Sequence, residues 1–229
     1  MQHRPVPARP TADRPPSLVP LPMRLRPATP GDFDAVADLA RLIDLRRSAE
    51  DLAPSLEVVR ETLATGAGDE GPFSHGPLHY VLAEFPDNGR PVGLARCGPG
   101  RWTVELDLPT FIRNKLYPRI GNVHELVVVP EYRGRGIARA LLERVEEDHR
   151  RAGYDALVLR HHREQTSFYT HLGYTSGSRL VLELPDRLGR ASVRGQGWRW
   201  AAKPLAPQVE VTDVHGSPVL TGLLAPHAL

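Results

Sequence analysis

The segment Val127–Leu142 constrains the fold more than any other part of the chain. Three valines lead into Pro130, two glycines alternate with two arginines, and a helical pattern of apolar residues follows at once. A strand that joins a helix through glycines leaves the first N–H groups of that helix free to bind a ligand. These donors and the positive end of the helix dipole suit an anion. The segment therefore predicts a strand, a turn and a helix that together cradle a pyrophosphate.

The arginines of this turn are consistent with such a cradle, but two well-known phosphate-binding motifs do not fit. Arg133, Arg135 and Arg139 would add charge-assisted donors. A Walker loop would need a Gly-Lys-Ser/Thr ending, which is absent. A Rossmann fingerprint would need a third glycine where Arg139 stands, and it usually opens its domain. Taken alone, the segment is explained equally well by a glycine-containing turn with solvated arginines.

The rest of the chain alternates strand and helix patterns. Helices are predicted from Phe33 to Ile43, from Ser55 to Leu63, and over residues 137–153 and 165–173. Strands are predicted over residues 23–29, 78–85, 91–97, 122–129, 154–160, 178–184 and 197–205, with a hairpin turn at Asn88-Gly89. Residues 103–108 favour a further strand, residues 109–121 a loop or short helix, and residues 186–197 a polar loop.

Both ends of the chain differ from the middle. Residues 1–22 contain seven prolines and little apolar periodicity, so we expect a disordered leader that the domain does not need for stability. Residues 206–229 predict a last hairpin about His215-Gly216. Because strands in such a tail expose edges that need covering, we expect them to pair within the chain or with a second copy, and we favour a homodimer.

Composition excludes several classes of protein. No run of about 18 apolar residues is present, so we expect no membrane span. The N-terminus lacks the apolar region of a secretory signal, which predicts a cytoplasmic protein. Cys97 is the only cysteine, so a disulfide within the chain and a cysteine-based zinc site are excluded. A net charge of +2 argues against a nucleic-acid surface.

Three motifs in order resemble one family. The hexapeptide Arg133–Ala138 resembles the Arg/Gln-x-x-Gly-x-Gly/Ala signature of the GNAT (general-control-related N-acetyltransferase) superfamily, whose members bind acetyl-CoA. Residues 23–42 resemble its first strand and helix, and Phe168–Tyr174 resembles its Phe-Tyr-x-x-Leu-Gly-Phe segment. The resemblance covers residues 23–205. It implies an α/β (α+β) fold: a mixed, mostly antiparallel sheet, splayed between its fourth and fifth strands, with helices on both faces.

The resemblance also implies how acetyl-CoA binds. The pantetheine arm would pair with backbone groups of Leu126, Val127 and Val128. The pyrophosphate would bind at the turn and the start of the helix, formed by Arg133, Gly134, Arg135, Gly136, Ile137, Ala138 and Arg139. His162 stands where the family often has an asparagine that contacts the cofactor, and it follows His161. The two histidines could bond the cofactor, relay a proton or end a strand in solvent. They have no acidic partner at ligand spacing, so we expect no metal.

The resemblance implies direct attack of an acceptor amine on the thioester. Tyr169 occupies the position of the family's frequent general acid; otherwise it is an aromatic core residue. Strand alternation places Asn122, His124, Leu126 and Val128 on one face, which makes His124 the first candidate for the general base. His124 could equally be a partly buried histidine bonded to backbone. A bulge would turn Glu125 inward instead, so Glu125 ranks second.

The sequence leaves the acceptor open. Its pocket would be walled by the first two helices and residues 101–121. The connection between those helices is mixed in charge, with Arg46 and Arg47 against Glu50 and Asp51. We therefore expect transfer of an acetyl group to a primary amine of a small molecule, peptide or protein. The alternatives are a domain that senses acyl-CoA without turnover, or a dinucleotide-binding oxidoreductase.

Overall fold

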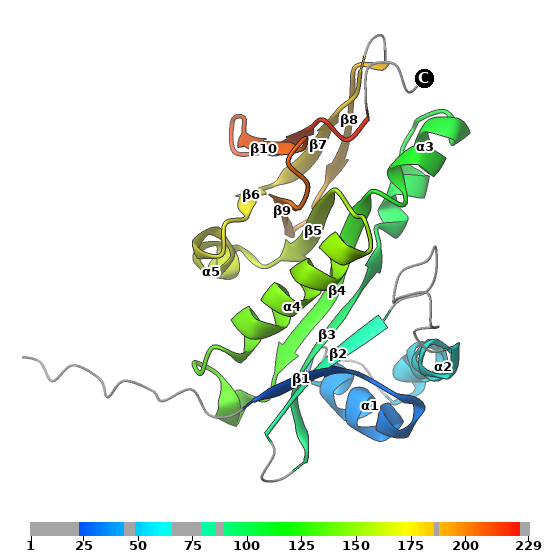
Figure 1. The fold of residues 1–229 in the computed structure, drawn as a ribbon, viewed down its shortest axis with the longest axis vertical. Helices are drawn as coiled ribbons and strands as arrows, with labels where there is room; N and C mark the ends of the chain where they lie inside the picture. Colours follow the sequence, from blue (N-terminus) through cyan, green and yellow to red (C-terminus); the bar gives the residue numbers. More distant parts are fainter. Residues whose placement is uncertain (1–22, 44–48, 66–78, 86–88, 186–187, 225–229) are drawn as a thin grey trace, which may run out of the picture.

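The computed structural model describes residues 23–43, 49–65, 79–85, 89–185 and 188–224. The expected leader, Leu78 and the Asn88 of the expected hairpin turn lie outside these residues. Two sheets form the scaffold: one of seven strands, in the order β1-β2-β3-β4-β5-β9-β6, and one of four, in the order β10-β11-β7-β8. Figure 1 shows the second sheet beyond β5 and β9, at the end of the molecule away from β1.

The seven-stranded sheet is mixed and mostly antiparallel, as the sequence predicts. Its members are β1 Arg24–Pro27, β2 His79–Glu84, β3 Pro91–Pro99, β4 Ile120–Val128, β5 Ala156–His161, β6 Thr175–Gly177 and β9 Arg199–Pro204. Among these described strands only β4 and β5 run parallel, and their pairing extends only from Ile120↔Ala156 to Val123↔Leu159. Because β4 continues to Val128 while this pairing stops, the sheet is splayed there, which confirms the predicted gap.

Helices cover both faces of this sheet (Figure 1). The five described α-helices are α1 Phe33–Arg41, α2 Ala49–Thr65, α3 Thr110–Leu116, α4 Ile137–Arg151 and α5 Thr166–His171. Adjacent residues of β2 divide between two cores because strand side chains alternate. Val81 belongs to the core that contains Leu141 of α4, whereas Leu82 belongs to the core that contains Leu39 of α1. The predicted helices on both faces are therefore confirmed.

The four-stranded sheet joins two segments that are distant in sequence. It contains β7 Arg179–Glu183, β8 Arg190–Arg194, β10 Glu210–Asp213 and β11 Pro218–Thr221. Strands β10 and β11 form the hairpin about His215-Gly216, whose φ angles of 52° and 71° are both positive, as a tight hairpin turn requires. Strand β11 then pairs in parallel with β7 of the same chain. One edge of the tail hairpin, that of β11, is thus covered within the chain, whereas β10 is the outer strand of its sheet.

Two local predictions are wrong. Residues 103–108 do not form a strand; the 3-10 helix Arg101–Glu105 takes up the first part of this segment. There the Thr103 hydroxyl and N–H both donate to the Gly100 carbonyl, which holds a turn rather than an extended chain. The polar loop expected at residues 186–197 contains β8, because the arginines and serine of this strand face outward while Ala191 is buried against β7.

Candidate active site

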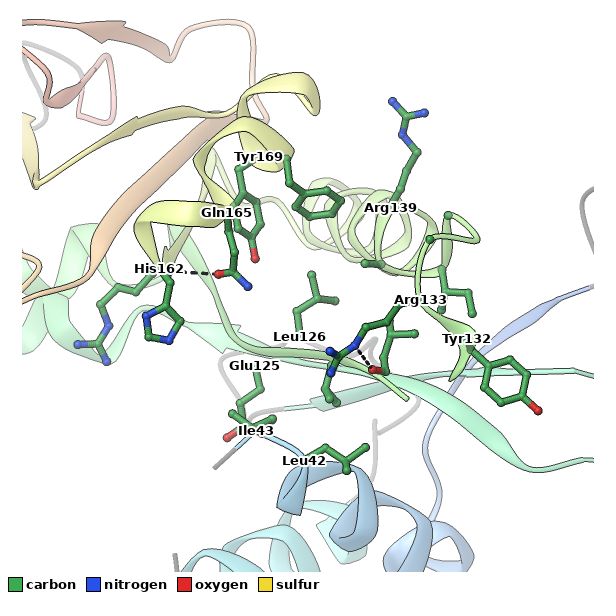
Figure 2. A pocket seen from close by; sticks show the side chains of 18 of the residues that line it. Leu42, Ile43, Glu125, Leu126, Tyr132, Arg133, Arg139, His162, Gln165 and Tyr169 are labelled. Atoms are coloured by element: carbon green, nitrogen blue, oxygen red, sulfur yellow. Dashed lines mark hydrogen bonds between the residues drawn. The ribbon is translucent and has the colours of Figure 1, made fainter. Parts of the chain in front are cut away.

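A cavity of about 650 Å³ opens where β4 and β5 part. Its walls come from the end of α1, the second half of β4, the turn before α4, the start of α5, and the turn that precedes β9 (Figure 2). The residues that line it are Leu42, Ile43, His124, Glu125, Leu126, Val127, Val128, Tyr132, Arg133, Gly134, Gly136, Ile137, Ala138, Arg139, Arg160, His162, Gln165, Phe168, Tyr169 and Trp198.

The glycine turn forms one end of the cavity. Gly134 and Gly136 have φ angles of +74° and +81°, a left-handed conformation that glycine adopts without steric cost. Gly136 is the N-cap of α4, and its carbonyl accepts the first helical bond, from Ala140. The N–H groups of the first turn therefore face the cavity end without helical partners. A Cβ at either glycine would meet no atom within 4 Å, so the space in front of the turn is open.

The splayed strand forms the floor. Leu126, Val127 and Val128 all line the cavity, and β5 pairs with β4 only as far as Val123. Within the described strands, the edge of β4 that faces β5 is therefore open over the three residues expected to hold the pantetheine arm. Such an edge presents N–H and C=O groups that an extended amide chain can pair with.

Arg135 is the one expected cofactor residue that does not line the cavity. Its guanidinium donates to the Glu131 carbonyl at 3.3 Å and lies over the Tyr132 ring, 5.3 Å from the centroid. Arg133 does line the cavity, and its Nε donates to the Val128 carbonyl at 3.1 Å, which ties the turn to the end of β4.

Tyr169 lies on α5 with only 6% of its surface exposed. Figure 2 shows its hydroxyl directed into the cavity, between Gln165 and Leu126. Burial raises the pKa of Tyr169 to about 12, so the phenol carries its proton at neutral pH. The ring packs against His161, with 4.8 Å between centroids, and this contact helps to fix its orientation. A protonated, oriented donor in a cavity is what a general acid requires.

A β-bulge changes the faces of β4. In the β3–β4 register Arg96 pairs with Glu125 and Cys97 pairs with Val123, which leaves His124 as the extra residue. Val123 and Val128 consequently lie in the same core, beneath α4. The prediction that Asn122, His124, Leu126 and Val128 share one face is therefore wrong, because the bulge reverses the alternation between Asn122 and Leu126.

His124 and Glu125 both line the cavity, in different electrostatic states. Burial, with a smaller contribution from Arg96, lowers the pKa of His124 to about 4, so its imidazole is neutral at pH 7. Its Nε2 is buried and has no hydrogen-bond partner within the described part of the chain. The Glu125 carboxylate instead lies 2.6 Å from the guanidinium of Arg96. Of the two candidate bases, Glu125 is therefore held in an ion pair, whereas the Nε2 of His124 has no partner among the described residues.

The paired histidines point to different environments. His162 lines the cavity, and its ring lies 3.9 Å from that of Trp198. His161 is buried and away from the cavity lining, with Nε2 2.8 Å from the Ser176 hydroxyl.

Sequence reasoning missed four residues of the cavity lining, namely Trp198, Arg160, Gln165 and Phe168. Of these, only Phe168 lies within a motif. The mixed charges at residues 46–51 lie outside the described side chains.

The described residues contain neither a metal site nor a membrane span. No group of three or more His, Cys, Asp or Glu side chains among them could hold a metal ion. No helix among them has both the length and the apolar composition needed to cross a membrane.

Comparison with known proteins identifies the domain. Residues 77–176 match the family model described as an acetyltransferase (GNAT) domain. This match spans β2 to β6, and hence most of the cavity. The family model therefore places residues 77–176 in a GNAT acetyltransferase domain.

Solved structures share the fold. The phosphinothricin acetyltransferase of Sinorhizobium meliloti, solved with acetyl-CoA, is 18% identical, with a TM-score of 0.53 over 85% of this chain and 94% of that one. A GNAT-family protein of Desulfovibrio desulfuricans is 22% identical, with a TM-score of 0.52 over 80% and 99%. The Salmonella typhimurium protein yncA, solved with acetyl-CoA, is 19% identical, with a TM-score of 0.51 over 81% and 95%. At these identities the likeness concerns the fold.

Proposed function

We propose that the protein is an acetyl-CoA-dependent N-acetyltransferase that acetylates a primary amine of a small molecule or peptide. The observation that carries this proposal is the convergence of three features on one cavity. These are the left-handed glycine turn at the start of α4, the open edge of β4 and the inward hydroxyl of Tyr169. The first two suit the pyrophosphate and the pantetheine of acetyl-CoA, and the third suits the leaving thiolate.

Different residues of the cavity carry the two proton transfers of the reaction. The acceptor nitrogen attacks the thioester carbonyl carbon, and the carbon–sulfur bond breaks. Tyr169 donates its proton to the departing sulfur, since its raised pKa keeps the phenol protonated. His124 accepts the proton that the amine loses, directly or through water, because its imidazole is neutral and its Nε2 is unpartnered among the described residues. Glu125, paired with Arg96, is the second candidate for this role.

The decisive experiment combines cofactor binding with turnover. Acetyl-CoA should raise the melting temperature, and NADPH should not, because a ligand that binds only the native state stabilises it. A panel of amines should then release free CoA and yield acetylated products. Acetyl-CoA binding without turnover on any amine would indicate a sensor, and stabilisation by NADPH alone would indicate an oxidoreductase.

A further inference from the structure

The charged side chains that line the cavity differ in whether they have hydrogen-bond or ion-pair partners. At the glycine turn, Arg133 donates to the Val128 carbonyl and Arg139 lies 3.6 Å from Glu143. At the other end, Glu125 is paired with Arg96. The side chain of Arg160, which also lines the cavity, forms no hydrogen bond or ion pair with any residue that the structure describes. Its guanidinium only lies over the Trp200 ring, 5.8 Å from the centroid.

Arg160 lies level with His124 in the sheet, because Leu159, the residue before Arg160, pairs in parallel with Val123, the residue before His124. It is next to last in β5 and is cross-strand partner to Trp200 of β9. Its charge, like those of Arg96 and Arg101, acts on His124. His124 precedes Val128 by four residues of β4, a distance of about 13 Å along an extended strand. Arg160 therefore stands beside the candidate base and well away from the glycine turn that suits the pyrophosphate.

The surroundings of Arg160 favour a ligand with an anionic group. Three arginines act on His124, and Glu125, the one carboxylate among the described residues of the lining, already neutralises Arg96. A guanidinium presents a planar fork that matches a carboxylate with two parallel hydrogen bonds. Trp198 is 41% exposed, and its ring lies against that of His162 at an interplanar angle of 33°. Both line the same cavity as Arg160, so an apolar part of the ligand has an aromatic surface to pack on.

We propose that Arg160 binds the carboxylate of the acceptor, so that the acceptor is a small amino acid-like molecule whose free amine is acetylated. The proposal rests on the N-acetyltransferase function and narrows it: a polyamine would be repelled, and a peptide N-terminus would bring no carboxylate of its own backbone to this position. Arg160 acts on specificity and on acceptor binding, and it takes no part in binding acetyl-CoA.

The test compares matched acceptors in two variants. Phenylalanine, phenylalanine amide and phenethylamine share the ring and the amine and differ at the carboxylate; γ-aminobutyrate and butylamine form a second pair with a longer spacing. The wild-type enzyme should show a kcat/KM that is about 10- to 100-fold higher for the carboxylate member of at least one pair, the range expected for a charged hydrogen-bonded contact. Arg160→Gln should abolish this preference and leave the Kd for acetyl-CoA unchanged. Arg163→Gln, an exposed arginine outside the cavity lining, should behave as wild type.

A binding measurement tests the same contact without turnover. N-acetylphenylalanine and N-acetyl-γ-aminobutyrate, titrated calorimetrically into the CoA-loaded protein, should include one that binds at least about tenfold more weakly to Arg160→Gln than to wild type or Arg163→Gln. Amine acetylation that ignores or disfavours the carboxylate, or that keeps its preference in Arg160→Gln, would overturn this proposal alone. A weaker Kd for acetyl-CoA in Arg160→Gln would overturn it too, by assigning Arg160 to the cofactor. Acetyl-CoA binding without acetylation of any amine would overturn the proposed function as well.

Discussion

The Glu125 carboxylate pairs with Arg96 at 2.6 Å, immediately after the bulge that sets His124 out of register. One strand thus offers the cavity a carboxylate with a cationic partner and an imidazole whose Nε2 is unpartnered among the described residues. This difference determines which of the two can take a proton from the acceptor, and it makes their roles separable by pH.

If His124 is the base, the rate, corrected for the fraction of the acceptor that is free amine, should be nearly independent of pH from about 7.5 to about 5.5. A base works in its deprotonated form, and the pKa of His124 is lowered from 6.5 to about 4, so activity should fall only below about pH 5. Single-turnover rates, with circular dichroism to verify folding at each pH, measure this. His124→Ala should reduce the rate about 10²-fold across the range. An acidic limb near pH 6.5 that persists in His124→Ala would assign the proton to another group.

Tyr169→Phe should separate chemistry from binding. The variant keeps the ring and removes the hydroxyl, so the Kd for acetyl-CoA should hold while the single-turnover rate falls by about 10²-fold, or about 2.7 kcal/mol of transition-state stabilisation. Tyr174→Phe is the matched control, because that hydroxyl donates to the buried Glu146 at 3.0 Å and not into the cavity. Tyr174→Phe should lower the melting temperature and leave the single-turnover rate unchanged. Full activity in Tyr169→Phe would make Tyr169 a packing residue.

Gly136→Ala should weaken acetyl-CoA binding by at least about tenfold. The added methyl meets no protein atom, but it projects where the pyrophosphate must approach the amides of α4. Gly153→Ala controls for backbone strain, because Gly153 has a φ of +82° against +81° for Gly136 and also meets nothing within 4 Å. Calorimetric titration of both variants isolates the site effect. Equal losses of affinity in the two would show that strain alone is responsible.

Stability should fall between about pH 6.5 and about pH 4 because of buried histidines. Burial lowers the pKa of His149 to about 4, and burial together with the charge of His149 lowers that of His79 to about 3. The unfolded chain, with ordinary pKa values near 6.5, therefore binds more protons in this range, so the free energy of unfolding rises with pH. Urea unfolding of His149→Gln should show a shallower pH dependence than wild type, whereas exposed His171→Gln should match wild type. An unchanged slope in His149→Gln would contradict the argument.

Leu220→Ala should destabilise the whole domain. Leu220 is fully buried in the core that contains Leu180, Leu182 and Trp200, so its truncation should cost about 2–5 kcal/mol of unfolding free energy. Val214→Ala, on the exposed turn of the same hairpin, should cost less than about 0.5 kcal/mol. Urea denaturation compares the two. Similar small losses would mean that the C-terminal hairpin is only loosely attached.

The sequence predicts the fold well where patterns are local. The glycine turn, the amphipathic helix α4 and the apolar strands β4 and β5 follow from periodicity and capping, and the family motif supplies their order. The sequence allowed a bulge in this strand only as a second alternative, because the nearly continuous apolar run of β4 carries no alternation from which a register shift could be read. Strand β8 was not predicted because its arginines obscure the alternation of apolar and polar residues.

The candidate site, too, is only partly predictable from the sequence. The turn, the β4 floor and Tyr169 lie within motifs, and the structure brings them to one cavity. Arg160 and Trp198 lie outside any motif. Arg160 follows the last β5 residue that pairs with β4, and Trp198 directly precedes β9, which inserts between β5 and β6. Arg135 lies within the motif, yet it turns to Tyr132, because position in a motif does not determine the direction of a side chain.

The parallel pairing of β11 with β7 has a consequence for synthesis of the chain. Strand β7 emerges from the ribosome first, with Leu180 and Leu182 on its inner face, and their cover from Leu220 is still to be translated. Until residues 218–221 emerge, the nascent protein must carry these leucines incompletely covered, a state open to aggregation and chaperone binding. The acetyltransferase fold is thus completed from its C-terminal side, after the turn, the floor and Tyr169 have already been made.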